Sequence, residues 1–388
     1  MRTTIRFLPA ILAATLLAAC GGGDDDKVRF TSVVSFGDSV SDAGAYKVGT
    51  IAALGGGKFT VNGPDGLTWT EVLATKVNAP AQCAAQTGML PNNGTTGAPV
   101  QNFAACFNYA QGSSRVSSSG TGPNGVALQT AFAEQNLGFM AISLQEQFST
   151  HLEKVGGAFH RTDLVTVNSG GNDAFMQLTA VGSAAGGGAA AVATGSVAGW
   201  PQATLDVVAL GGANAVNAAG AAAVAAMGQA GAQLASDINS MLVGKGARYV
   251  LVRNLGDLNF TPFGLSLDAA TKGLITAMTQ AFNSQLKAGL GNSSGALPYG
   301  VILYDDYAQT AAIAADPSRY GYSNITTQSC GANAFGSPDG ASIVCNTGNL
   351  IPGDTSKYAF SDSVHPTPYA HQQAAEFALS LMVASGWQ

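Results

Sequence analysis

Four short runs of apolar and β-branched residues recur along the chain, separated by much longer mixed segments. They cover residues 30–36, 163–168, 247–253 and 299–304. Continuous apolar runs of about four to eight residues are typical of strands buried on both faces. Gly37 closes the first run and Gly170 closely follows the second, so both runs can end in a turn. We therefore predict four buried strands.

Longer stretches with helical character lie between and after these runs. They cover residues 69–77, 142–155, 205–242, 269–290 and 368–383. Strands that alternate with helices predict an α/β fold with a parallel sheet covered on both faces. In such sheets ligands bind beyond the carboxyl ends of the strands. Because no internal repeat or second boundary is visible, we expect one domain over residues 29–388.

Residues 179–235 consist mainly of alanine and glycine. Part of this stretch permits helix, and the three glycines at 186–188 indicate a surface excursion. A plain insertion is the interpretation we favour, and a lid over a ligand site is the alternative.

The amino-terminal segment is typical of an export signal. Two arginines precede an apolar run over residues 7–19. A bilayer requires ~20 residues, so this run is too short to span one. Residues 1–19 therefore indicate a secretory signal peptide.

The end of this segment, Leu17-Ala-Ala-Cys20, resembles the bacterial lipobox, in which the cysteine is lipidated and becomes the new amino terminus. Residues 20–28 would then be the lipidated cysteine and a flexible tether. We expect an exported, membrane-anchored lipoprotein on the periplasmic side or the cell surface. Gly21, in place of aspartate, favours the outer membrane. Ordinary cleavage, with Cys20 as a bystander, is the alternative.

The composition excludes several classes of protein. Apolar residues make up 46% of the 388 residues, charged residues 10%, and 50 residues are glycine. This balance allows a sizeable core and excludes a wholly disordered chain or a coiled coil. The formal net charge is −6, and removal of the two arginines of the signal segment would make it −8. Phosphate backbones would be repelled, so we expect no nucleic-acid partner.

Four further cysteines lie within the expected domain: Cys83, Cys106, Cys330 and Cys345. None forms a Cys-x-x-Cys pair, which argues against a zinc site, and we expect no metal. An even number in an exported chain favours two disulfides. Of the three possible connectivities, the simplest joins Cys83 to Cys106 and Cys330 to Cys345.

Candidate chemistry lies at the two ends of the chain. Ser39 directly follows the first predicted strand, where it could be a nucleophile or merely cap a helix. Asp362 precedes His365 by three residues, a spacing that brings two side chains to one side of a turn. An acid beside a histidine fixes its tautomer and stabilises the imidazolium. A surface Asp–His pair is the alternative.

Together with two further segments, these residues resemble the GDSL, or SGNH, family of serine hydrolases. Four blocks occur in the family's order: Gly-Asp-Ser at 37–39, Asn-Tyr-Ala-Gln-Gly at 108–112, Gly-Gly-Asn-Asp at 170–173 and Asp-Ser-Val-His at 362–365. Further similarity extends from about residue 30 to the carboxyl terminus. One departure is Val40, where the family name has leucine.

The resemblance implies a three-layer α/β/α flavodoxin-like fold with a parallel central sheet. It implies Ser39 as nucleophile, His365 as base and Asp362 as the acid that orients the base. It also implies an oxyanion hole formed by the backbone N–H groups of Ser39 and Gly112 and the side-chain amide of Asn172.

A serine hydroxyl needs an adjacent base to attack an ester near neutral pH. We therefore expect a serine-dependent carboxylic-ester hydrolase that works through an acyl-enzyme and needs no cofactor. The expected substrate is a lipid or a short acyl ester, and the expected membrane contact is through the lipid anchor. The alternatives are a polysaccharide acetyl esterase, a polyester depolymerase, or a non-catalytic surface-binding lipoprotein.

The remaining histidines lie outside the four blocks. We expect His151 and His160 to be solvated, and His371 to be at the surface or in packing.

The sequence also predicts roles for several acidic residues. We expect Asp38 and Asp42 to bond the backbone of the turn around Ser39, and Asp173 to brace Asn172. The pair Asp305-Asp306 is expected to be solvated.

Overall fold

The computed structural model describes residues 27–388 except 90–95, 117–140, 293 and 295. Its centre is a sheet of four parallel strands in the order β1-β4-β5-β6. The strands are β1 (Ser32–Phe36), β4 (Asp163–Asn168), β5 (Tyr249–Arg253) and β6 (Val301–Tyr304). The predicted strands and their parallel arrangement are confirmed.

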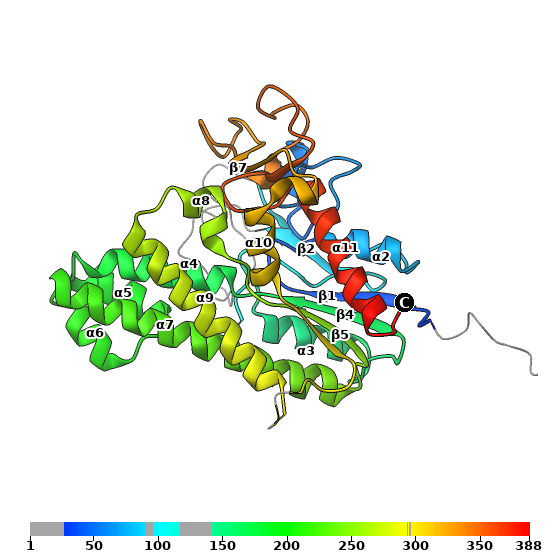
Figure 1. Cartoon of the computed structure of the whole chain (residues 1–388), viewed down its shortest axis with the longest axis horizontal. Helices are drawn as coiled ribbons and strands as arrows, with labels where there is room; N and C mark the ends of the chain where they lie inside the picture. Colours follow the sequence, from blue (N-terminus) through cyan, green and yellow to red (C-terminus); the bar gives the residue numbers. More distant parts are fainter. Residues whose placement is uncertain (1–26, 90–95, 117–140, 293, 295) are drawn as a thin grey trace, which may run out of the picture.

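Neighbouring residues of a strand point to opposite faces, and in this sheet both faces are apolar. Val33, Leu164 and Leu251 pack against the helices of one face, and Val34, Val165 and Val250 pack against those of the other. The first face is covered by α2 (Trp69–Lys76) and α11 (Pro368–Ala384). The second is covered by α3 (Leu144–Lys154), α4 (Gly171–Ala184), α7 (Gly212–Asp237) and α9 (Ala269–Leu290) (Figure 1). This is the expected three-layer α/β/α arrangement.

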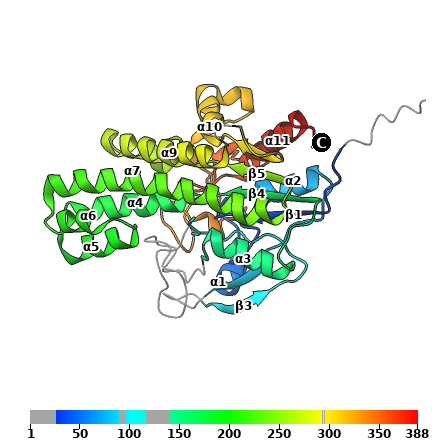
Figure 2. The same cartoon turned by 90° about the horizontal axis from the view of Figure 1, so that it is seen from below.

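The alanine- and glycine-rich stretch forms a helical extension at the end of the molecule opposite the carboxyl terminus (Figure 2). It comprises the end of α4, α5 (Gly188–Val197), α6 (Gln202–Val208) and most of α7. Most positions of the buried stripe of α7 hold alanine or glycine, which lets this helix lie closely against its neighbours. The predicted helix over 205–242 is interrupted at Gly211, a residue with φ of 69° that separates α6 from α7.

Shorter elements complete the fold. They are α1 (Gly49–Ala53), β2 (Gln86–Met89), β3 (Ala98–Asn102), α8 (Pro262–Leu265), α10 (Asp306–Ala315), β7 (Asn324–Gln328) and β8 (Tyr358–Phe360). Short 3-10 or π segments are η2 (Ile238–Leu242), η3 (Val243–Lys245), η4 (Leu258–Phe260), η5 (Pro317–Tyr320) and η6 (Ser342–Val344). Strands β2 and β3 form an antiparallel pair, and β7 and β8 a parallel one.

Two disulfides join Cys83 to Cys106 and Cys330 to Cys345, which confirms the simplest pairing. No helix in the described part of the chain is both long and apolar enough to span a bilayer. The expected signal peptide and the lipidation site Cys20 lie outside the described residues.

Candidate active site

The turn that follows β1 carries Ser39. Strand β1 lies so close to the end of β4 that a Cβ on Gly37 would be 2.5 Å from Oδ1 of Asn168, so only glycine fits here. Asp38 then accepts hydrogen bonds on Oδ1 from the Val40 N–H (3.1 Å) and from the Asn168 amide (2.8 Å). Asp38 therefore bonds the turn, as predicted.

Three side chains from the two ends of the chain meet beside this turn. Nε2 of His365 lies 2.9 Å from Oγ of Ser39, although 326 positions separate them in the sequence. Nδ1 of His365 lies 2.8 Å from Oδ2 of Asp362. A proton on Nδ1 is held by the carboxylate, so Nε2 is free to accept the serine proton. The structure thus brings together the three residues proposed for catalysis.

Asp362 is a buried carboxylate with several donors. Its Oδ1 accepts the backbone N–H groups of Val364 and His365, at 2.9 and 2.7 Å, and its Oδ2 accepts that of Ser342 at 3.0 Å. Burial by itself raises the pKa of Asp362, but the charge of His365 and these hydrogen bonds outweigh it and hold the pKa well below its usual value. The carboxylate therefore stays ionised beside the imidazole.

The loop that was expected to supply a backbone donor differs in one respect from the sequence prediction. The N–H of Gly112 donates to Oδ2 of Asp42 at 2.9 Å. A Cβ at this position would overlap the ring of Phe59 at 2.2 Å. Packing and the bond to Asp42 thus account for this glycine, and the prediction that its N–H faces an oxyanion is contradicted.

The next residue, Ser113, lies at the cavity, whereas Gly112 does not line it. Ser113 has a φ of 70°, is 4% exposed and lines the same cavity as Ser39. No acceptor for its backbone N–H, or for that of Ser39, occurs in the described part of the chain. The left-handed backbone that turns Ser113 toward the cavity could not be inferred from the sequence, because such a φ is uncommon for serine.

Asn172 lies in the first turn of α4 and also lines the cavity. Its Nδ2 donates to the carbonyl of Ser114 at 2.9 Å, which uses one of the two amide hydrogens and orients the other. Among the described residues, no side-chain hydrogen bond links Asp173 to Asn172. It accepts from Nε of Arg115 (3.3 Å) and the N–H of Val116 (3.1 Å), which corrects its expected role.

A cavity of about 290 Å³ opens beside Ser39, Asn172 and His365. Its apolar wall includes Phe175, Leu255, Leu258, Phe260, Phe263 and Phe360. The residues that follow all four parallel strands reach it, as predicted for ligand sites of such sheets. No residue of 179–235 lines it, so the interpretation of that stretch as a plain insertion is supported over a lid.

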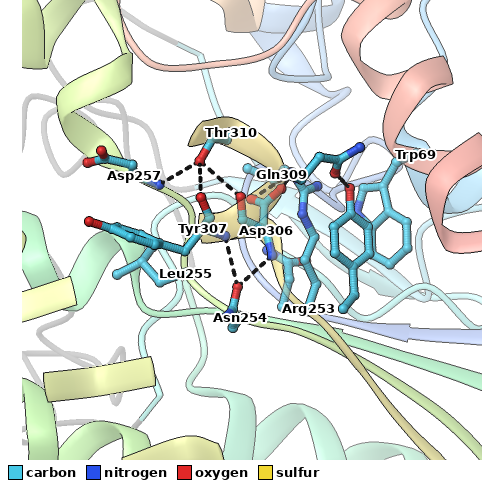
Figure 3. Close-up of polar contacts among 12 residues, drawn as sticks. Trp69, Arg253, Asn254, Leu255, Asp257, Asp306, Tyr307, Gln309 and Thr310 are labelled. Atoms are coloured by element: carbon cyan, nitrogen blue, oxygen red, sulfur yellow. Dashed lines mark hydrogen bonds and ion pairs between the residues drawn. The ribbon is translucent and has the colours of Figure 1, made fainter. Parts of the chain in front are cut away.

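A buried ion pair lies beside the cavity, at the ends of β5 and β6. Nη2 of Arg253 is 2.9 Å from both carboxylate oxygens of Asp306 (Figure 3). The guanidinium also stands 5.1 Å from the ring of Tyr304. The prediction of a solvated pair is therefore wrong for Asp306, because the adjacent strand presents a cation to it. Asp305 is exposed and caps α10 through the N–H of Ala308.

The other histidines are structural or solvated. His151 is 1% exposed, lies 4.5 Å from the ring of Phe159 and contacts the Tyr109 hydroxyl at 3.1 Å, so the expectation of solvation is wrong. Its place on the apolar face of α3, seven residues after Leu144, was the signal available in the sequence. His160 is exposed as predicted. His371 is buried and accepts the backbone N–H of Trp69, which is a packing role.

The family that the sequence matches is consistent with this arrangement. Residues 33–378 match the family described as GDSL-like lipase/acylhydrolase. A solved chain described as a GDSL-like lipase from Parabacteroides merdae ATCC 43184 is 11% identical, with 93% of this chain and 98% of that chain covered and a TM-score of 0.35. Phospholipase A1 from Streptomyces albidoflavus NA297 is 15% identical, with 90% and 98% covered and a TM-score of 0.39. No curated protein matches the sequence.

Proposed function

The chain belongs to the GDSL-like lipase/acylhydrolase family and is an ester-hydrolysing enzyme, and on this premise we propose that it cleaves carboxylic esters through an acyl-enzyme at Ser39. The observation that carries the proposal is the 2.9 Å contact between the Ser39 hydroxyl and Nε2 of His365, with the Asp362 carboxylate on the far side of the imidazole. This is the geometry that nucleophilic catalysis by serine requires.

The reaction begins when Oγ of Ser39 attacks the ester carbonyl carbon and its proton passes to Nε2 of His365. Asp362 stabilises the imidazolium that results. The imidazolium then protonates the leaving alcohol, which leaves an acyl group on Ser39. Water, deprotonated by the same imidazole, hydrolyses this acyl-enzyme and restores the free hydroxyl.

The tetrahedral oxyanion needs hydrogen-bond donors that are already in place. We assign them to the backbone N–H groups of Ser39 and Ser113 and to the second amide hydrogen of Asn172. Ser113 replaces Gly112 in this assignment, because the N–H of Gly112 is already bonded to Asp42. Loss of one such donor typically costs about 3 kcal/mol of transition-state stabilisation.

For the substrate, we propose an ester with an apolar acyl chain, of the lipid or short acyl type. The support is the aromatic and aliphatic wall of the cavity, which offers an acyl chain a surface away from water. Lipidation of Cys20 would keep the enzyme at a membrane, in the outer membrane or at the cell surface, and so near such esters. An acetyl ester of a polysaccharide would leave most of this wall unused.

A fluorophosphonate probe, which captures an activated serine covalently, tests the mechanism. We expect labelling at Ser39 in the wild type, and no labelling or turnover in Ser39→Ala or His365→Ala variants that remain folded by circular dichroism. Failure of the folded wild type to react would overturn the proposal and favour a binding protein. A panel of esters from acetyl to long acyl chains, with a phospholipid included, tests the substrate class, and a preference for acetyl esters would contradict it.

A further inference from the structure

The orientation of Asp362, the third member of the catalytic arrangement, depends on a hydrogen-bond donor from a distant part of the chain. Two of its three backbone donors, Val364 and His365, belong to its own turn and follow from local geometry. The third, the N–H of Ser342, comes from 20 residues earlier and bonds Oδ2, the oxygen nearest to Nδ1 of His365. The orientation of the carboxylate toward the imidazole therefore depends on where Ser342 is held.

Ser342 begins η6, a single turn of three residues that cannot hold its own position. Cys345 follows this turn, and its N–H donates to the carbonyl of Ser342 at 3.0 Å. The disulfide then joins Cys345 to Cys330, and the N–H of Cys330 donates to the carbonyl of Ser361 at 2.8 Å. Ser361 immediately precedes Asp362. The disulfide thus completes a closed path that runs from the Asp362 carboxylate, through Ser342 and the disulfide, back to the backbone next to Asp362.

Further contacts of η6 are with residues 57–62. The amide of Asn62 donates to the carbonyls of Ser342 and Cys345 at 3.1 and 3.0 Å, and the N–H of Gly57 donates to Ile343. Ile343 also packs with Phe59 in a separate apolar cluster. These contacts would keep the segment folded without the disulfide. The disulfide, however, cross-links the segment of Ser342 to Cys330, the residue whose N–H holds the carbonyl next to Asp362.

We propose that the Cys330–Cys345 disulfide is a positioning element for Asp362, so that ester hydrolysis depends on its oxidation. The inference rests on the proposed function of Ser39. Bond formation removes one hydrogen atom from each thiol, and a disulfide oxidant such as oxidised glutathione takes up both and becomes two thiols. A chain still in a reducing compartment would have the Ser39 nucleophile in place, but its Asp362 carboxylate would not be held in a fixed orientation.

This role has a kinetic signature. None of residues 329–345 lines the cavity, so loss of the disulfide should leave KM unchanged. A displaced carboxylate orients the imidazole poorly, and we expect kcat to fall about a hundredfold. It also stabilises the imidazolium less, so the acidic limb of the pH profile of kcat/KM should move to lower pH.

The test compares the two disulfides of the same chain. The double variant Cys330→Ala/Cys345→Ala should show the loss in kcat, the unchanged KM and the shifted acidic limb. The matched control Cys83→Ala/Cys106→Ala removes a disulfide whose backbone bonds to Phe103 and to Asn108, on the nucleophile side, and should keep kcat within about threefold of the wild type. Melting temperatures of both variants report the general loss of stability.

Equal losses of kcat in the two variants, or wild-type kcat in the first, would overturn the inference. If the first variant does not fold, the purified wild type is reduced with a phosphine and then reoxidised with glutathione disulfide, and peptide mapping identifies which bond has opened. Activity must then fall when the Cys330–Cys345 bond opens and return when it re-forms. Failure of the proposed function would be distinct, because the oxidised wild type would then not react with the fluorophosphonate.

Discussion

Asp42 determines which backbone N–H groups near Ser39 remain for a substrate. Its carboxylate accepts from Gly44, Ala45 and Gly112, so the glycine that the family resemblance pointed to is already bonded. Ser113, one position later, lines the cavity, and its N–H has no acceptor among the described residues. At the scale of residues, therefore, the role of an amide group follows from the partner it meets and not from its place in a motif.

The first prediction separates the donors of the proposed oxyanion hole. Asn172→Ala removes a side-chain donor and should lower kcat about a hundredfold with little change in KM, because the oxyanion exists only near the transition state. Ser113→Ala keeps the backbone N–H and should keep kcat within about threefold. Steady-state kinetics on one soluble ester measures both, and a large loss in Ser113→Ala would mean that its hydroxyl, not its N–H, is used.

The second prediction concerns the buried His151. Burial lowers the pKa of His151 to about 4, from about 6.5 in the unfolded chain. Between these values the unfolded chain binds a proton that the native state does not, so His151 makes the free energy of unfolding fall as pH drops from about 6.5 to 4. A full pH unit in this window corresponds to about 1.4 kcal/mol.

The check is urea unfolding at pH 7 and at pH 4.5, for the wild type and for His151→Phe. The variant should lose less stability than the wild type between these two pH values. Parallel losses in the two proteins would show that His151 already titrates normally in the native state.

At the scale of elements, the small residues of α7 serve its contact with α9. Gly231 lies against the backbone of α9, where a Cβ would be 2.2 Å from the carbonyl oxygen of Phe282. Gly220, on the same helix, has only a methyl of Leu274 at 3.9 Å. Composition alone does not distinguish these two glycines, because only the packed partner makes one of them necessary.

The third prediction uses this pair. Gly231→Ala should destabilise the protein by about 1–3 kcal/mol, because the helices must separate. Gly220→Ala should instead stabilise it by up to about 1 kcal/mol, since alanine is the better helix former and the space is open. Thermal or urea unfolding measures both, and equal effects of the two substitutions would contradict the close approach of the helices.

For the molecule as a whole, the parallel sheet brings the two ends of the chain together. Strand β1 supplies the turn of Ser39, while β8 leads into Asp362 and His365, and α11 then packs on the same face as α2. Among the described residues, those that line the cavity begin at Asp38, well after the proposed anchor at Cys20. Anchoring and catalysis should therefore be separable.

The fourth prediction tests that separation. Cys20→Ala should release the exported protein from the membrane fraction, while the proposed hydrolysis of a soluble ester keeps its kcat and KM. Fractionation followed by assay of each fraction provides the measurement. A variant that stays in the membrane would indicate that Cys20 is a bystander of ordinary cleavage.

The sequence predicted the four strands, helices α2, α3, α9 and α11, and the juxtaposition of Ser39 with His365, and it favoured the disulfide pairing that the structure shows. The strands and helices follow from local apolar patterns, and the favoured disulfide pairing follows from the short loops that it closes. The meeting of Ser39 with His365 follows from the order of the four motifs along the chain. Tertiary structure alone decided that Asp42 binds Gly112, that Arg253 buries Asp306, and that Ser342 holds Asp362. The physical reason is that a hydrogen bond or ion pair depends on which partner arrives from a distant segment, and the spacing of residues along a chain carries no record of that.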